Sequence, residues 1–480
     1  MPQQEQVKNR VSPGATEPVA RDFINAIGGP LGRFARVGTQ QFWTPLRVLI
    51  FTSLLFLAGG FLTKANCIQG ARGSDGVVSL NWSGNRQYTS ACYNDIVPLY
   101  GGRGLDVPGF PYAYSWQEGD LTRYMEYPVL GGIFQWICAI ITRFLYPVFD
   151  VLPFHTLPEA GLYFIVTALA MSCFWVLIIR MVAELTGNRV WDTVLVAASP
   201  LVAVHAFTNW DIPSIAAVIG AMLAVKRGHF MWAGVLIGFG TAFKLWPLYL
   251  LGAYLVLAVR TGKFPDFLKM LGTAILSWVV VNAPIMLIYP AAWNEFLRLN
   301  RERGAEWTTI YQVIDRNIPL SFNDPEVLNV ISFMLFGLSC VAIAIFGWRV
   351  QRQPRVAELV FLIVAAFLLF NKVWSPQYSL WLVPLAVLAL PKWNLLLPWM
   401  LVDAMVWPIL MWHMLGAENM GIPHEILDIV VLARDGFIVA MVVLVIRQML
   451  GKIADPVLDA HAGLDPLLPT PQRAAGVEKH

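Results

Sequence analysis

The chain has 480 residues, of which 57% are hydrophobic and only 14% are charged, and its formal net charge is +3. Soluble domains carry about 25% charged residues, so this composition excludes an ordinary soluble protein and favours a polytopic, all-α membrane protein. The small net charge says little about partners, because the distribution of charge along the chain matters more than its sum.

The first 42 residues are polar and lack the apolar stretch of a cleaved signal peptide. They predict a disordered cytoplasmic tail over 1–42, and the Pro-, Ala- and Asp-rich residues 451–480 predict a second one. Between the tails, 43–450 is expected to form one transmembrane domain. A spanning helix needs roughly 20 apolar residues, and thirteen apolar segments, several of them short, follow one another at 45–63, 129–149, 160–179, 190–206, 210–225, 229–243, 245–259, 267–288, 327–348, 356–370, 376–390, 393–412 and 426–446.

Basic residues mark alternate connections between these segments, and the positive-inside rule places those connections in the cytoplasm. Both ends of the segment 129–149 then fall on the outer side. We therefore predict that it is a juxtamembrane or re-entrant helix in one continuous outer region, 64–159, and that about twelve segments cross. The alternative is that 129–149 crosses and a later short segment such as 210–225 is miscounted. The basic residues concerned are Lys226, Arg227, Arg260, Lys263, Lys269, Arg349, Arg352, Arg355, Arg447 and Lys452.

Two of the five cysteines, Cys67 and Cys92, fall in the predicted outer region, and the other three lie in apolar segments. An oxidising exterior permits a disulfide. Cys67 and Cys92 are thus the candidate pair, which would tie the loop of Asp95 to the end of the first helix.

The unusual polar clusters all lie on the outer side in this topology. Charged residues at the ends of spanning helices are costly and normally face a cavity or a partner, so the clusters predict one outward-facing site. The candidate site residues are Asp95, Arg103, Glu126, Asp211, Lys244, Arg298, Arg301, Lys372, Gln377 and Tyr378.

Each cluster also has a purely structural interpretation. Asp95 could cap a short helix, and Asp211 could simply pair with Lys244. Lys372 could snorkel to the membrane interface, and the arginines of 298–303 could form a solvated helix face. The neighbouring tryptophans could belong to an aromatic belt at the interface; they are Trp246, Trp374 and Trp381.

A carboxylate on a short loop beside a basic, aromatic cavity suits transfer of a group from a lipid-linked phosphate to a hydroxyl. Asp95 would take the proton of the attacking hydroxyl, and cationic side chains would neutralise the departing phosphate. Arg103 is expected to help hold Asp95 ionised, and Glu126 to position the acceptor or Arg123. We find no Walker motif, nucleotide-binding glycine fingerprint or His/Cys metal constellation. No cofactor or metal site is therefore expected, although assistance by a divalent metal stays open.

Four stretches carry a resemblance to a known family: YNDIVPLYGGRGL (93–105), EYPVLGG (126–132), LIGFGTAFKLWPLYLL (236–251) and FNKVWSPQYSLWLVPL (370–385). They resemble the polyprenol-phosphate-sugar-dependent glycosyltransferases of the GT-C superfamily, in particular glycosyltransferase family 87 (domain of unknown function 2029). That family includes alpha-mannosyltransferases and an arabinofuranosyltransferase of bacterial cell envelopes.

The resemblance covers about 45–450 and implies a GT-C fold, with Asp95 as catalytic base and Lys244 as a contact of the donor phosphate. Two departures bear on the acceptor and the sugar. Val129 stands where the family has a second proline after Tyr-Pro, and TNWD (208–211) replaces its Gly-Gln-x-Asn.

The resemblance implies an enzyme of the bacterial plasma membrane whose active site faces outward and whose termini are cytoplasmic. It would transfer mannose or arabinofuranose from a polyprenyl-phosphate donor to an envelope glycan or glycolipid. Its partners would be that donor, the acceptor and membrane lipids, with no nucleic acid. The alternative function is a transporter or flippase for a lipid-linked envelope precursor, although no internal repeat of the kind common in transporters is evident.

Overall fold

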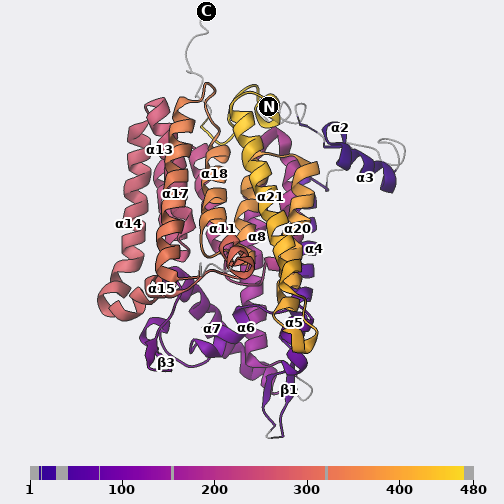
Figure 1. The fold of residues 1–480 in the computed structure, drawn as a ribbon, viewed down its shortest axis with the longest axis vertical. Coiled ribbons are helices and arrows are strands. Elements are labelled where there is room, and N and C mark those ends of the chain that lie inside the picture. The colour runs from indigo at the N-terminus through magenta and orange to yellow at the C-terminus, as the bar shows by residue number, and fades with distance from the viewer. Residues whose placement is uncertain are drawn as a thin grey trace, which may run out of the picture.

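The computed structural model describes residues 10–11, 13–28, 42–74, 76–152, 156–318 and 323–469. It is a bundle of helices with a smaller loop region at one end, drawn at the bottom of Figure 1. In the described part, seven helices are long and apolar enough to cross a membrane. They are α4 (Pro45–Lys64), α7 (Val129–Asp150), α8 (Glu159–Leu185), α14 (Phe264–Ile288), α17 (Pro325–Arg349), α20 (Trp393–His413) and α21 (His424–Met449).

Two of the long helices, α4 and α17, begin with a capping residue followed by proline. Thr44 accepts a hydrogen bond from the backbone of Arg47 at the start of α4, and Asp324 accepts one from Glu326 at the start of α17. Proline in the first turn has no amide hydrogen to leave unpaired, and the cap satisfies one free backbone donor. These local signals set where the apolar segments become helical.

Shorter apolar helices lie between the long ones. They are α11 (Ile212–Lys226), α12 (Phe230–Phe243), α13 (Tyr249–Thr261) after η5 (Trp246–Leu248), α18 (Val356–Phe370) and α19 (Ser379–Ala389) after η6 (Pro376–Tyr378). The predicted segment 190–206 is broken into η4 (Gly187–Thr193), α9 (Val194–Ala197) and α10 (Pro200–His205). Irregular backbone at membrane depth is tolerated where protein surrounds it, and most of this segment is buried.

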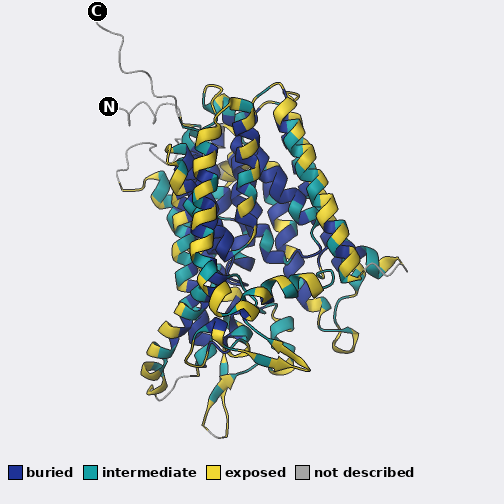
Figure 2. Cartoon of the chain, turned by 90° about the vertical axis from the view of Figure 1, so that its left-hand side faces the viewer, coloured by how far each residue is buried: buried dark blue, intermediate teal, exposed yellow. Residues whose placement is uncertain are grey.

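The short helices form the centre of the bundle. Almost every residue of α11, α18 and α19 is buried, whereas α17 exposes large apolar side chains such as Phe333 and Leu338. Figure 2 shows this contrast between a buried interior and exposed outlying helices. Helices that are apolar on all sides are expected in such an interior. The exposed apolar faces of the outlying helices suit contact with lipid.

The loop region at the lower end collects segments from distant parts of the chain (Figure 1). Its β1 (Gly70–Arg72) pairs antiparallel with β2 (Val78–Leu80), and β3 (Trp116–Glu118) pairs antiparallel with β4 (Leu121–Arg123). The structure contains the disulfide Cys67–Cys92, with Cα atoms 5.6 Å apart. The region's other elements are η1 (Ala65–Cys67), η2 (Ser83–Asn85), α5 (Arg86–Thr89), α6 (Ile96–Gly102), η3 (Pro111–Ala113), α15 (Pro290–Glu302), α16 (Ile310–Asn317) and η7 (Ala417–Asn419).

Helix α7 begins and ends at this same end of the bundle. Near its start, Gly131 packs against the carbonyl oxygen of Phe243, at the end of α12. Just beyond its end, the carbonyl oxygen of Thr156 accepts a hydrogen bond of 3.1 Å from the backbone of Gly70, in β1. Length and hydropathy alone would allow α7 to cross a membrane. Its contacts instead favour the predicted juxtamembrane helix.

Parts of both predicted disordered tails are helical and docked at the opposite end of the bundle. Residues 13–28 form α2 (Pro13–Thr16) and α3 (Pro18–Gly28), and α22 (Pro456–Ala460) lies in the second tail. Asp455 accepts a hydrogen bond of 2.8 Å from the Arg355 side chain. The expectation of disorder therefore fails for these segments, because composition does not show that a tail residue has a buried partner. Residues 1–9, 29–41 and 470–480 lie outside the described residues.

Candidate active site

The loop that carries Asp95 is held by separate parts of the fold. The ammonium of Lys64, at the end of α4, donates to the carbonyl oxygen of Tyr93 at 3.1 Å. The backbone amide of Asp95 donates to the carbonyl oxygen of Thr208, after α10, at 2.8 Å. The disulfide at Cys92 adds a covalent link to the end of α4. Asp95 is thus placed by the packing of helices that are far apart in sequence.

The side chain of Asp95 does not cap a helix. Asp95 occupies the N-cap position of α6 but accepts no capping hydrogen bond there. Its neighbour Asn94 does so instead, since Asn94 Oδ1 accepts from the backbone amide of Val97 at 3.0 Å. Asp95 Oδ2 accepts a hydrogen bond of 2.7 Å from Asn209, whose amide also lies 3.1 Å from the hydroxyl of Tyr127. The capping interpretation is therefore wrong, and the carboxylate is oriented by Asn209.

The surroundings of Asp95 leave it a stronger base than an exposed aspartate. Burial raises the pKa of its carboxyl, while hydrogen bonds from Asn209 and Tyr93 and the charge of Lys244 lower it. The negative charge of Glu306 raises the pKa further, and the net direction is upward. A general base takes up a proton more readily as its pKa approaches the working pH. The environment therefore suits proton abstraction.

Asp211 and Lys244 form an ion pair beside this carboxylate. Lys244 Nζ lies 2.7 Å from Asp211 Oδ1, and the same oxygen accepts a hydrogen bond of 2.8 Å from the indole of Trp381. Asp211 is 1% exposed, and its Oδ2 has no hydrogen-bond partner among the described residues. The pairing expected from the sequence is present.

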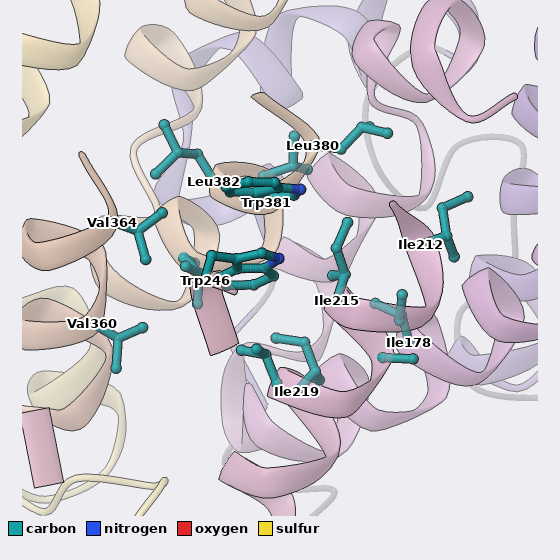
Figure 3. Packing of buried hydrophobic residues seen from close by; sticks show 14 of the residues in the cluster. Ile178, Ile212, Ile215, Ile219, Trp246, Val360, Val364, Leu380, Trp381 and Leu382 are labelled. Carbon is teal, nitrogen blue, oxygen red and sulfur yellow. The ribbon is translucent and has the colours of Figure 1, made fainter. Parts of the chain in front are cut away.

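Aromatic rings form one wall of the site. The rings of Tyr378 and Trp381 stack with centroids 4.3 Å apart, and Trp246 stacks on Trp381 at 5.0 Å and 9°, as Figure 3 shows for the two indoles. Lys244 Nζ lies 4.9 Å from the centroid of Tyr378, and Gln377 is buried beside it in the chain. Trp246, Trp374 and Trp381 are all at most 3% exposed, so they are not members of a lipid-facing belt.

Arg103 and Glu126 contact each other rather than the partners expected for them. Arg103 forms an ion pair of 2.7 Å with Glu126 and lies 4.6 Å from the centroid of Trp116. The expected pairing of Arg103 with Asp95 is therefore replaced by one with Glu126. Arg123, the expected partner of Glu126, instead lies 2.8 Å from Glu295, because β4 carries its side chain toward α15.

Lys372 is buried and does not snorkel. Its ammonium donates to the carbonyl oxygens of Arg301 and Arg303, which lie on either side of Glu302 at the C-terminal end of α15. Burial and the nearby charge of Arg303 lower the pKa of Lys372 to about 8. The lysine therefore anchors the loop that begins at Arg303 and leads to Glu306.

Arg298 also forms ion pairs within the protein. Its guanidinium binds Glu295 at 2.7 Å and Glu302 at 2.6 Å, while Arg301 is exposed. Among the predicted residues, the structure thus brings Asp95, Asp211, Lys244 and Tyr378 together. It places Arg298 in a separate ionic cluster.

Three residues of the site were not predicted: Tyr127, Asn209 and Glu306. Asn209 and Tyr127 make the contacts with the Asp95 side chain described above, and Glu306 pairs with Arg303 at 2.7 Å within the electrostatic range of Asp95. The sequence singles out Asn209 only as part of the replaced motif TNWD (208–211). Its position two residues before a charged residue at a helix start was the available signal.

One cavity adjoins the site, and a second is lined by none of the site residues named above. One of about 220 Å³ lies between α7, α12, α14 and α15, and its lining includes Tyr127, Trp278 and Trp293. A larger, apolar groove of about 540 Å³ runs between α13, α17 and α18, starting at Leu248 and Tyr249. The described residues contain no group of three His, Cys, Asp or Glu that could hold a metal ion.

Comparison with known proteins points to glycosyl transfer. The model of glycosyltransferase family 87 matches residues 144–376, slightly less than half of the chain. GPI mannosyltransferase 1 of Kluyveromyces lactis is 24% identical over 182 residues, which cover 35% of this chain and 44% of that protein. The chain thus aligns with less than half of that relative's length. The family match includes Asp211 and Lys244, whereas Asp95 precedes it. Both similarities are to glycosyltransferases and support glycosyltransferase activity.

Proposed function

We propose that the protein transfers a sugar from a polyprenyl-phosphate donor to a hydroxyl of an envelope glycan or glycolipid, at the outer face of a bacterial plasma membrane. The observation that carries the proposal is that the carboxylate of Asp95 does not cap a helix and is instead oriented by Asn209. Asn94 makes the capping hydrogen bond in place of Asp95, and Asn209 donates a hydrogen bond to the Asp95 carboxylate. The charge of Lys244 is close enough to lower the pKa of that carboxylate. The donor sugar would be mannose or arabinofuranose, and the similarity to a protein named as a mannosyltransferase favours mannose.

In the proposed reaction Asp95 accepts the proton of the acceptor hydroxyl. The acceptor oxygen forms a bond to the anomeric carbon as the bond from that carbon to the phosphate oxygen breaks. The leaving polyprenyl phosphate keeps the bonding electron pair, so negative charge grows on its phosphate. A positioned cation stabilises such charge, and Lys244 is the candidate because only Asp211 pairs with it in the described structure.

The surfaces around the site suit this donor. The apolar groove between α13, α17 and α18 begins at Tyr249, and the ring of Phe367 links Tyr249 to Trp381 with centroid distances of 4.9 and 6.4 Å. An apolar chain in the groove would therefore place its head close to Lys244. The predicted outward orientation of the site and the cytoplasmic location of both termini belong to this proposal.

The proposal can be tested with the purified protein in liposomes. Radiolabelled polyprenyl-phosphate mannose and polyprenyl-phosphate arabinofuranose would be supplied separately, together with an envelope glycolipid extract. We expect label to appear in the acceptor fraction with one donor, and Asp95→Asn to abolish it. Movement of the donor across the liposome membrane without any transfer would overturn the proposal in favour of a transporter.

A further inference from the structure

The cavity of about 220 Å³ between α7, α12, α14 and α15 lies beside the candidate base. One nitrogen, the side-chain amide of Asn209, donates both to Asp95 Oδ2 at 2.7 Å and to the hydroxyl of Tyr127 at 3.1 Å. The backbone amide of Trp210 donates to Asn209 Oδ1, which fixes the orientation of that amide. Because Tyr127 lines the cavity, a group bound at its hydroxyl lies close to the Asp95 carboxylate.

The walls of this cavity are rich in aromatic rings. They include the side chains of Tyr112, Tyr127, Trp278, Trp293 and Phe296. The face of an aromatic ring carries partial negative charge, so it attracts the weakly positive C–H groups on the flat face of a sugar ring. Sites for small ligands combine such apolar walls with a few placed polar groups. The lining therefore suits a sugar ring whose hydroxyls reach the edge of the cavity at Tyr127.

Hydrogen bonds hold two of these rings in place. The indole of Trp293, on α15, donates to Asn282 Oδ1 at 3.1 Å, and Asn282 Nδ2 donates to the carbonyl oxygen of Trp278 at 3.0 Å. The hydroxyl of Tyr112 donates to the carbonyl oxygen of Tyr127 at 2.8 Å. Asn282 is buried among apolar neighbours in α14, where a polar side chain is costly without partners. Its contacts fix Trp293, and a preformed wall lowers the cost of binding a ligand.

The cavity is separate from the groove proposed for the donor chain. That groove lies between α13, α17 and α18, and the two share no lining residue. Pockets that hold drug-sized ligands measure roughly 300–1,000 Å³, so the smaller cavity suits a single ring rather than a long chain. Its walls α7 and α15 lie at the end of the bundle that carries the loop region (Figure 1). The site therefore has one place for an apolar chain and another for a second substrate.

We propose that this cavity binds the terminal sugar ring of the acceptor, with the hydroxyl that receives the new sugar directed at Asp95. The inference rests on the proposed sugar transfer and adds the place of the second substrate. The ring would stack on Trp293. Tyr127 would donate a hydrogen bond to a neighbouring sugar oxygen, because its hydroxyl accepts from Asn209 and can still donate its own proton. A general base must lie within hydrogen-bond reach of the hydroxyl that it deprotonates, and Asn209 holds Tyr127 and Asp95 close enough for one ring to contact both.

Matched leucine-to-tryptophan variants of the full-length protein test the assignment. Leu297 lines the cavity, Leu248 lines the donor groove, and both are exposed enough to accept a larger ring. Initial rates in liposomes are measured with the labelled donor and the envelope glycolipid extract, each varied in turn. Leu297→Trp should raise the KM for the extract by at least about tenfold, equivalent to about 1.4 kcal/mol, and leave the KM for the donor unchanged. Leu248→Trp should raise only the KM for the donor. Leu276→Trp, at an exposed position of α14, should change neither.

A second pair of variants distinguishes a sugar ring from a lipid chain in the cavity. Trp293→Phe and Trp293→Leu both lose the indole hydrogen bond to Asn282, but only Trp293→Leu also loses the aromatic face. A sugar ring needs that face, so Trp293→Leu should raise the KM for the extract several-fold more than Trp293→Phe. A lipid chain packs equally well against either side chain. Equal KM values in the two variants would therefore overturn the assignment to a sugar.

The remaining outcomes separate this inference from the proposed function. Thermal unfolding identifies the folded variants, and if Leu297→Trp does not fold, the two Trp293 variants decide. A raised KM for the donor in Leu297→Trp would assign the cavity to the donor and contradict the inference. Unchanged KM values for both substrates in that variant would contradict it as well, while transfer by the wild-type protein would leave the proposed function intact. Absence of transfer by the wild-type protein with either donor would instead remove the proposed function.

Discussion

Asn209 donates its side-chain amide to the carboxylate of Asp95 over 2.7 Å, although the two residues are 114 positions apart. The contact joins the first loop of the lower region to the start of α11. It is reinforced by the backbone hydrogen bond from Asp95 to Thr208. The position of the Asp95 carboxylate therefore depends on how α6, α10 and α11 pack together. Single substitutions can distinguish residues that position this carboxylate from the residue that accepts the proton.

Asp95→Asn should fold normally and lose about 10²- to 10⁴-fold in transfer rate, the typical effect of removing a general base. Folding should survive because Asn94 makes the capping hydrogen bond. Asn94→Ala is the matched control: we expect a loss of about 1 kcal/mol in stability, with transfer per folded molecule far less affected than in Asp95→Asn. Thermal unfolding and radiolabel transfer measure the two effects. Near-native transfer by Asp95→Asn would contradict the proposal that Asp95 is the general base of sugar transfer.

Asn209→Leu should move the acidic limb of the rate profile to higher pH. The hydrogen bond from Asn209 lowers the pKa of Asp95, so its loss raises that pKa, and a higher pH is then needed to ionise the base. Asn209→Asp should shift the limb further, because a second carboxylate disfavours ionisation. The measurement is kcat/KM between pH 5 and about 9. A uniform loss at every pH would show that Asn209 only places Asp95.

Features with a local or periodic signal were predictable from the sequence. Most of the apolar segments appear as helices close to their expected bounds, although 190–206 is broken into shorter elements. Asp211 pairs with Lys244, as its structural interpretation predicted. Cys67 and Cys92 are bonded, as their location in the predicted outer region allowed.

Features that depend on tertiary packing were not predictable. The sequence predicts that Arg103 acts on Asp95, but in the fold Arg103, at the end of α6, pairs with Glu126 instead. Lys372 looked like an interface lysine, and only the position of α15 shows that it binds carbonyl oxygens there. The position of Asn209 before Asp211 at a helix start marks it as a polar residue of interest but does not show that it contacts Asp95, 114 positions away. The roles of the candidate residues in transfer stay predictions.

Glu126→Gln should reduce transfer only modestly, by less than Asp95→Asn. Its carboxylate is paired with Arg103, so it supports the shape of the loop rather than accepting the proton. Arg103→Gln should have an effect of similar size, since either change breaks the same ion pair, and the double variant should be little worse than each single one. Transfer assays on the three variants check this. If Glu126→Gln lowered the transfer rate as much as Asp95→Asn, Glu126 would be the proton acceptor and Asp95 the supporting residue.

Lys244 should be required for use of the donor, but its removal alone does not test this cleanly. Lys244→Met leaves Asp211 buried and unpaired, and breaking a buried ion pair in this way costs about 3 to 5 kcal/mol. The double variant Lys244→Met with Asp211→Asn removes both charges and should regain most of that stability. Lys244→Arg keeps the charge with a different geometry.

If Lys244 contacts the donor phosphate, the double variant should fold and yet transfer at least about 100-fold more slowly, as expected for loss of charge stabilisation in the transition state. Lys244→Arg should retain part of the activity and show a raised KM for the donor. Thermal unfolding identifies the folded variants, and initial rates over a range of donor concentrations separate KM from kcat. A double variant with native stability and native transfer would mean that the ion pair serves only to hold α11 against the end of α12.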